Sequence, residues 1–207
     1  PTHDAPQNGY LNRSRVSLDY IPRDNNHPYR PAIIFRMAEA YLSYAEALNE
    51  SSERMSHKQE ILDNLNKIRH RAGIAEYGTG TDENGFTRIK INFSDQKEVR
   101  RLIHKERRVE FVGEGVRYHD LRRWKTAHYG IGNLNEQGEN PDWGVNGPDY
   151  GMNYYGTEYT DQGDNAFFKR TKYMDRVYPR KFYWYPIHQS EIDKDPTLVQ
   201  GPFWLGE

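Results

Sequence analysis

The feature that most restricts the fold of this chain is a charged stretch from Lys105 to Trp124, which reads KERRVEFVGEGVRYHDLRRW. Together with the residues just before it, this stretch carries apolar side chains at helical spacing, namely Val99, Leu102, Ile103, Val109 and Val112. Glu106 falls on the same stripe. The pattern therefore predicts a helix that points one carboxylate inward.

The acids of this helix follow one another at i,i+4 spacing, at Glu106, Glu110 and Glu114. Like charges at this spacing destabilise an isolated helix, so the acids need cations from another segment. The nearest arginines follow the glycines at 113 and 115, and guanidinium suits a partly buried carboxylate because it donates two parallel hydrogen bonds. We therefore predict a structural ion-pair seam, made of Glu106, Glu110, Glu114, Arg117 and Arg123, that joins two successive helices.

The same acids could instead serve catalysis, because two carboxylates one helical turn apart lie at about the 5–5.5 Å separation of retaining glycosidases. Such an enzyme needs one carboxyl group with a raised pKa, whereas neighbouring arginines favour the ionised form of both. The histidines show no zinc-protease spacing, no serine stands in a nucleophile elbow, and no glycine-rich phosphate loop follows a strand. The sequence therefore predicts no enzyme, no cofactor and no metal site.

The stretch from Glu106 to Trp124 resembles the C-terminal signature of the SusD/RagB family of outer-membrane nutrient-binding lipoproteins. That signature runs Glu-Arg-Arg-x-Glu-Phe/Leu-x-x-Glu-Gly-x-Arg-Tyr/Trp-x-Asp-Leu-x-Arg-Trp. Residues 36–50 and 65–73 are also very similar to the family, and the tail resembles its Pro-Ile-Pro-x-x-Glu segment and its closing Gln-Asn-Pro-Gly-aromatic. The tail departs from these at His188 and Gly201. The resemblance covers nearly the whole chain in the right order.

Residues 32–126 are predicted to form a helical framework after an irregular, proline-containing lead-in over residues 1–31. A first helix is expected from Pro31 to about Glu50, with its apolar face at Ile34, Met37, Ala38, Tyr41, Leu42, Ala45 and Leu48. A capping box of Ser56 and Gln59 should begin a second helix that stops at Gly73. Alanines at the crossing points make this pair similar to a tetratricopeptide hairpin.

Two more helices complete the predicted framework. Asp95 with Glu98 should cap a third helix that runs to about Phe111, and Val116 to Thr126 should form a fourth. Alternating apolar residues over 89–93 predict a short strand. The expected fold is therefore mainly α, with tetratricopeptide-like helical hairpins (SusD-like) and long irregular aromatic-rich loops, as one domain over residues 1–207.

Residues 127–207 are predicted to be a long loop region followed by a C-terminal tail, because helical periodicity disappears there. Glycine-spaced aromatic side chains crowd the loop, and the candidate glycan contacts are Trp143, Tyr150, Tyr154, Tyr155 and Tyr159. Sugars present apolar C–H faces, which aromatic rings can cover while polar neighbours bind the hydroxyl groups. Alternatively, these rings could simply pin a long loop onto the helices. The sequence leaves both interpretations open.

Composition narrows the classes of partner. The formal net charge is −1, which provides no basic excess to neutralise phosphates and argues against nucleic acid as a partner. The chain has no cysteine, which excludes disulfides and thiolate metal sites. No apolar run approaches the roughly 20 residues that a membrane-spanning helix needs.

The family resemblance implies a cell-surface protein on the outer membrane that binds an oligosaccharide or polysaccharide, or sometimes a peptide, and delivers it to a TonB-dependent, SusC-like transporter. Family members are longer and carry an N-terminal lipid anchor, so this chain is expected to be the C-terminal portion of such a protein. Its contact with the membrane would then run only through an anchor that the chain does not include. The alternative is a helical-repeat interaction scaffold that binds a peptide or the transporter itself rather than sugar.

Overall fold

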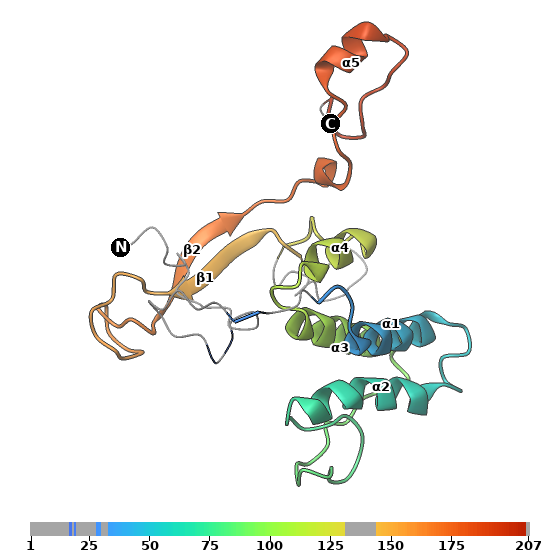
Figure 1. The fold of residues 1–207 in the computed structure, drawn as a ribbon, viewed down its shortest axis with the longest axis vertical. Coiled ribbons are helices and arrows are strands. Elements are labelled where there is room, and N and C mark those ends of the chain that lie inside the picture. The colour runs from blue at the N-terminus through green and yellow to red at the C-terminus, as the bar shows by residue number, and fades with distance from the viewer. Residues whose placement is uncertain (1–16, 18, 20–27, 30–32, 131–143, 206–207) are drawn as a thin grey trace. The chain divides into compact units, whose positions relative to one another are not determined.

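A computed structural model describes residues 17, 19, 28–29, 33–130 and 144–205 (Figure 1). The backbone divides into two compact units. The described residues of one, the helical unit, lie within Arg13–Arg117, and those of the other, the hairpin unit, lie within Tyr118–Glu207. The single domain expected from the sequence stays a prediction.

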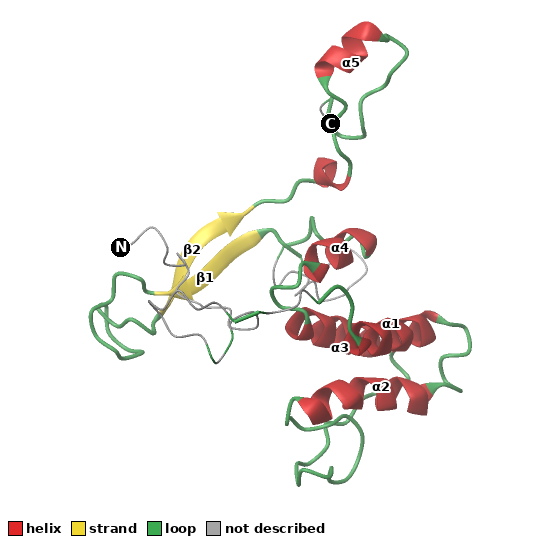
Figure 2. Cartoon of the chain, in the orientation of Figure 1, coloured by secondary structure: helices red, strands yellow, loops and turns green. Residues whose placement is uncertain are grey.

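The helical unit is built from α1 (Met37–Glu50), α2 (Lys58–Arg71) and α3 (Gln96–Glu110), with α1 packed against both of the others. Figure 2 shows these helices in red. Apolar residues three and four positions apart on each helix face the shared core, because this spacing brings side chains to one side of a helix. The fully buried apolar side chains of these helices are Leu42, Ala45, Ile61, Leu65, Val99 and Ile103.

The predicted beginnings of α1 and α2 are wrong in detail. Ile34 is 97% exposed and Met37 is 59% exposed, so the buried face of α1 begins only at Ala38. Pro31 lies outside the described residues. Ser56 does not cap α2, because its Oγ donates to the carbonyl of Glu53. The predicted stop is confirmed, since α2 ends at Arg71 and Gly73 follows with a φ of +66°.

The predicted beginning of α3 is confirmed. The Asp95 carboxylate accepts hydrogen bonds from the N–H groups of Lys97 and Glu98. Glu106 is only 6% exposed, so its carboxylate does point inward. The predicted burial of Val109 and Val112 is wrong, since both are more than half exposed. The inward stripe continues instead through charged residues, Glu106 and Arg107, and these cover the end of the core.

The segment between α2 and α3 folds as a loop, and the strand predicted over residues 89–93 is not formed. Single bridges join Tyr77 to Ile89 and Thr81 to Thr87. Within this loop the Asp82 carboxylate accepts hydrogen bonds from the N–H groups of Glu76, Asn84 and Phe86. A buried aspartate thereby replaces strand pairing as the support for this backbone.

α4 (Val116–Arg123) begins at the end of the helical unit, and the hairpin unit follows with β1 (Gly147–Met152), β2 (Arg170–Arg176), η1 (Arg180–Tyr183) and α5 (Gln189–Lys194). β1 and β2 pair antiparallel, from Gly147 opposite Arg176 to Met152 opposite Arg170. The sequence predicted only irregular structure here. The sequence of β2 carries no strand pattern, because the strand is almost entirely exposed and its apolar and polar residues do not alternate.

Candidate functional site

The acids of the predicted ion-pair seam are paired, but with different cations from those expected. Glu106 Oε1 lies 2.5 Å from Arg69 Nη1 and accepts a hydrogen bond of 2.8 Å from the Tyr77 hydroxyl. Glu110 pairs with Arg36 and Arg71. These arginines come from α2 and from the residue that precedes α1, so the expectation that α4 would supply the partners is corrected.

The remaining predicted seam residues also differ from expectation. Glu114 forms a two-pronged pair with Arg36, with N–O distances of 3.0 and 2.7 Å, and this pair raises the pKa of the Arg36 guanidinium. Arg123 Nε pairs with Asp120 in its own helix at 2.8 Å. Arg117 is half-buried at the start of α4. The pairs around α3 therefore tie the helical unit together internally.

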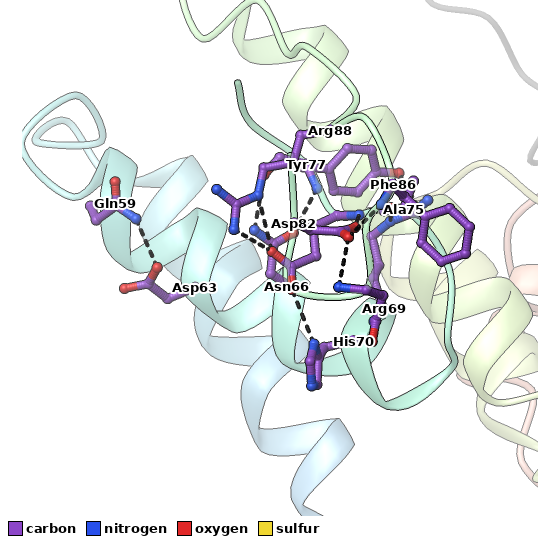
Figure 3. A network of polar contacts seen from close by, with 12 residues as sticks. Gln59, Asp63, Asn66, Arg69, His70, Ala75, Tyr77, Asp82, Phe86 and Arg88 are labelled. Atoms are coloured by element: carbon purple, nitrogen blue, oxygen red, sulfur yellow. Dashed lines mark hydrogen bonds and ion pairs between the residues drawn. The ribbon is translucent and has the colours of Figure 1, made fainter. Parts of the chain in front are cut away.

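A second polar network joins α2 to the loop that follows it (Figure 3). The Asn66 side chain bonds both the N–H and the carbonyl of Tyr77, and Arg69 Nε donates to the carbonyl of Ala75. Glu76 accepts from Arg88 Nη2 at 2.8 Å. A groove of about 830 Å³ runs along this part of α2 and is lined by both acidic and basic side chains.

The tyrosines proposed as glycan contacts lie on β1 and on the connection from β1 to β2. Tyr155 and Tyr159 are each 84% exposed, whereas Tyr154 is half-buried with its ring edge-on to that of Tyr155 at 5.8 Å. The Tyr159 ring lies 6.0 Å from that of Phe167. Tyr150 lies on β1 with the Arg170 guanidinium 4.3 Å from its ring centre. The structure thus brings Tyr154, Tyr155 and Tyr159 to one loop, and Trp143 lies outside the described residues.

A concave site forms elsewhere in the hairpin unit, beside the end of α4. It is a cavity of about 470 Å³ lined by Arg122, Lys125, His128, Tyr129, Arg180, Tyr183, Trp184 and Phe203. We refer to it as the α4 cavity. Its volume falls within the range of about 300–1,000 Å³ that is usual for small-molecule sites.

The aromatic rings of the α4 cavity form a continuous series. His128 lies 4.1 Å from Tyr129 and 5.6 Å from Tyr183, measured between ring centres. Tyr183 lies 6.0 Å from Trp184, which in turn lies 5.7 Å from Phe203. Such a series offers flat apolar surface over more than one side of a ligand.

Hydrogen bonds hold this series in place. Arg122 Nη2 donates to the carbonyl of Tyr183 at 2.6 Å, and the Tyr183 hydroxyl lies 2.9 Å from His128 Nδ1. Burial raises the pKa of the Tyr183 hydroxyl above its ordinary value. Trp204 Nε1 donates to the carbonyl of Trp184 at 3.2 Å. The walls of the cavity are thereby fixed before any ligand arrives.

Two residues of the α4 cavity have a backbone conformation that side chains disfavour. Lys125 has a φ of +56° and Phe203 a φ of +64°, and they are the only residues other than glycine with positive φ in the described part of the chain. Such conformations cost about 1–3 kcal/mol and concentrate at ligand sites. The Lys125 conformation also ends α4 before Thr126, where the sequence had placed its end.

Sequence reasoning missed the α4 cavity. Its rings come from the segment just after α4, at His128 and Tyr129, and from the C-terminal tail, whereas composition directed attention to the aromatic residues between them. The one signal available was that ring-bearing residues stand next to each other at both ends of this region, at His128 and Tyr129 and again from Phe182 to Tyr185.

Two features are absent from the described residues. No cluster of three or more histidine and acidic side chains there could hold a metal ion. Nor does any helix in the same residues have the length and hydrophobicity needed to cross a membrane.

Comparison with known proteins agrees with the resemblance. The family model described as "SusD family" matches residues 1–204. Two curated relatives come from Formosa agariphila. SusD-like protein P25 is 32% identical over 109 residues, which cover 53% of this chain and 18% of that protein. SusD-like protein P38 is 32% identical over 103 residues, which cover 50% of this chain and 19% of that protein. The matched region therefore spans about a fifth of each curated relative.

Solved structures are similar as well. The crystal structure of a SusD-like protein (BF3747) from Bacteroides fragilis is 27% identical, with a TM-score of 0.53, and the match covers 83% of this chain and 26% of that one. The structure named BT4246 is 29% identical with a TM-score of 0.52, over 84% of this chain and 24% of that one. The predominantly helical fold is thus shared with SusD-like proteins, and the family match extends over almost every residue. The chain belongs to the SusD family.

Proposed function

We propose that this chain is part of a cell-surface protein of the outer membrane that binds oligosaccharides and delivers them to a TonB-dependent, SusC-like transporter. Family membership supports the general role in glycan binding and nutrient uptake. The observation that carries the proposal for this chain is the α4 cavity, a ring-lined hollow of suitable volume in a SusD-family protein. We further propose that a lipid anchor holds the protein at the membrane surface.

The chemistry of the α4 cavity suits a sugar. Trp184 and Phe203 are each about two-fifths exposed, so their rings remain available to the apolar C–H face of a pyranose. Lys125 and Arg180 bring polar groups to the same walls, where hydroxyl groups of a ligand could bond. Each exchanged hydrogen bond contributes only about 0.5–1.5 kcal/mol net, so modest affinity is expected.

The exposed tyrosines of the β1–β2 connection are a further proposed contact. Tyr155 and Tyr159 present almost their whole rings to solvent, and clustered exposed rings commonly mark a partner site. An extended glycan could bind there as well as in the α4 cavity. Trp143 remains a proposed contact on the basis of its sequence position alone.

The alternative of a peptide-binding helical scaffold would use the groove along α2. We favour the glycan role, because the groove is lined by side chains already engaged in the network of Figure 3, including Asn66, Glu76 and Arg88. We also propose that the chain binds without catalysis. Glu106 and Glu110, the carboxylates that a glycosidase would use, are both paired with arginine.

The proposal is tested by titrating the chain with a panel of oligosaccharides while following tryptophan fluorescence. We expect saturable binding of at least one oligosaccharide, and a loss of at least tenfold in affinity for Trp184→Ala, because a sugar would lose its largest ring platform. Tyr155→Ala and Trp143→Ala, measured against the same ligand, test the loop contacts separately. Folding of each variant is checked by circular dichroism. If no oligosaccharide binds, or if folded Trp184→Ala binds as the parent does, the α4 cavity is not the site.

A further inference from the structure

The described residues that line the α4 cavity carry charge of one sign only. Arg122, Lys125 and Arg180 bring three cationic side chains to it, and none of the described residues that line it is acidic. The whole chain has a formal net charge of −1, so this concentration of positive charge is local rather than a reflection of composition. From it we infer that the cavity selects an acidic saccharide, whose sugar carries a carboxylate or a sulfate group. The inference rests on the proposed function and narrows its ligand class.

The cations differ in what they already bind. Arg122 is engaged, because it donates to the Tyr183 carbonyl and lies over the rings of Tyr118 and Tyr185 at 5.2 Å from each. The side chains of Lys125 and Arg180 form no hydrogen bond or ion pair with any other residue that the structure describes. Both are exposed. Arg122 therefore supports the wall, while Lys125 and Arg180 are available to an anion.

An acidic group is the ligand chemistry that answers these two cations. Carboxylate and sulfate oxygens accept charge-assisted hydrogen bonds, which are roughly twice as strong as those between neutral groups. A neutral sugar would gain much less from an ammonium and a guanidinium. The absence of acidic residues from the described lining also means that an anion would meet no like charge there.

Beside these cations, the aromatic rings of Trp184 and Phe203 supply the apolar surface that would bind the sugar. Trp184 and Phe203 lie 5.7 Å apart with their planes at 49°, so they form two adjoining walls of the cavity. Phe203 holds its ring there at a φ of +64°. Glycine would adopt that backbone without strain, so fold formation alone does not call for phenylalanine. A ligand that binds the ring accounts for its presence.

The test compares trigalacturonate with its methyl ester, which keeps the sugar skeleton and removes the charge. We expect the acid to bind at least tenfold more tightly than the ester, and its affinity to fall with added sodium chloride while that of the ester changes little. A sulfated κ-carrageenan oligosaccharide is titrated in parallel, so that selectivity for carboxylate and for sulfate can be separated.

The variants Lys125→Gln and Arg180→Gln should each lower affinity for the acid severalfold and leave the ester unaffected. Lys172→Gln is the matched control. It removes the same charge from β2, where Lys172 pairs with Asp175 at the surface and does not line the cavity. This control should bind the acid as the parent does.

Phe203→Gly separates a binding role from a structural one. It removes the ring and relieves the backbone, so the variant should melt no lower than the parent but should bind both saccharides at least tenfold less tightly. If Phe203 served only packing, Phe203→Gly would lower the melting temperature and leave the affinity of the folded protein unchanged.

The two proposals fail in different ways. If acid and ester bind equally, and Trp184→Ala and Phe203→Gly weaken both, the inference of an acidic ligand is wrong and the glycan-binding function stands. If the acid binds more tightly but Lys125→Gln and Arg180→Gln leave that preference intact, the anionic group of the ligand is not bound in the α4 cavity. If no saccharide binds at all, both the function and the inference fall.

Discussion

The buried pair between Arg69 and Glu106 is expected to be a major source of stability in the helical unit. Both side chains are about nine-tenths buried, with exposed fractions of 10% and 7%. Glu106 also accepts from the Tyr77 hydroxyl, and the Arg69 guanidinium lies 4.3 Å from the centre of the Tyr77 ring. Replacing Arg69 with methionine would leave the carboxylate in the core without its cation.

The magnitude follows from that geometry. Removing one partner of a buried ion pair costs about 3–5 kcal/mol, because the remaining charge is left uncompensated. Arg69→Met also removes the hydrogen bond to the carbonyl of Ala75. For a chain of this size, 1 kcal/mol shifts the melting temperature by about 2–4 °C, so we expect a decrease on the order of 10 °C.

Thermal unfolding followed by far-ultraviolet circular dichroism measures this effect, since helices dominate that signal. Arg100→Met is the control. It breaks the Arg100–Glu50 pair, in which the side chains are 27% and 40% exposed, and exposed pairs contribute only about 0–1 kcal/mol. The double variant Arg69→Met/Glu106→Gln should regain part of the loss, because it removes the uncompensated charge. The reasoning would be refuted if Arg69→Met melted within about 2 °C of the parent.

Three further outcomes are expected. Three backbone N–H groups outweigh the effect of burial on the Asp82 carboxylate and lower its pKa below the ordinary 3.8. The carboxylate therefore stabilises the 74–88 loop above pH 3.8, and this stabilisation is lost as pH falls through the lowered pKa. Amide chemical shifts of Asn84 and Phe86 should report the midpoint of that titration, and a midpoint at 3.8 or higher would contradict the prediction. Gly156→Ala should destabilise the β1–β2 connection by about 1–3 kcal/mol, because the added Cβ would lie 2.6 Å from the Phe167 backbone, whereas Thr157→Ala at the exposed neighbouring position should change unfolding little. The purified chain should release no reducing ends from any oligosaccharide that it binds, and release abolished by Glu110→Gln would overturn the proposal that it is not an enzyme.

The parts of the fold that could be predicted are those set by local spacing. Helical periodicity located α1, α2 and α3, and the Asp95 cap and the Gly73 stop depend on residues within one turn of each helix end. The inward direction of Glu106 followed from the same spacing. β2 could not be found this way, because its exposed side chains carry no periodic pattern.

The partners of the acids were beyond local reasoning. Repulsion among Glu106, Glu110 and Glu114 shows that cations must come from elsewhere, but it does not say from where. The nearest arginines in sequence were the natural choice, yet Arg36 lies 74 positions from Glu110 and Arg69 lies 37 positions from Glu106. Pairings over such distances are set by how α1 and α2 pack, which charge spacing alone does not encode.

The acidic residues of the family signature act in the helical framework. Glu106, Glu110 and Glu114 are all paired with arginines inside the helical unit, and Arg107 lies 3.8 Å from Glu46 in α1. The α4 cavity, in contrast, draws on positions that the signature leaves open. Arg122 stands at one of its unspecified positions, Lys125 follows its end, and Phe203 lies far beyond it in the C-terminal tail. In this chain, the residues that carry the family signature are therefore separate from those proposed to select the ligand, so substitutions at Arg122, Lys125 or Phe203 should change ligand preference while leaving the helical framework intact.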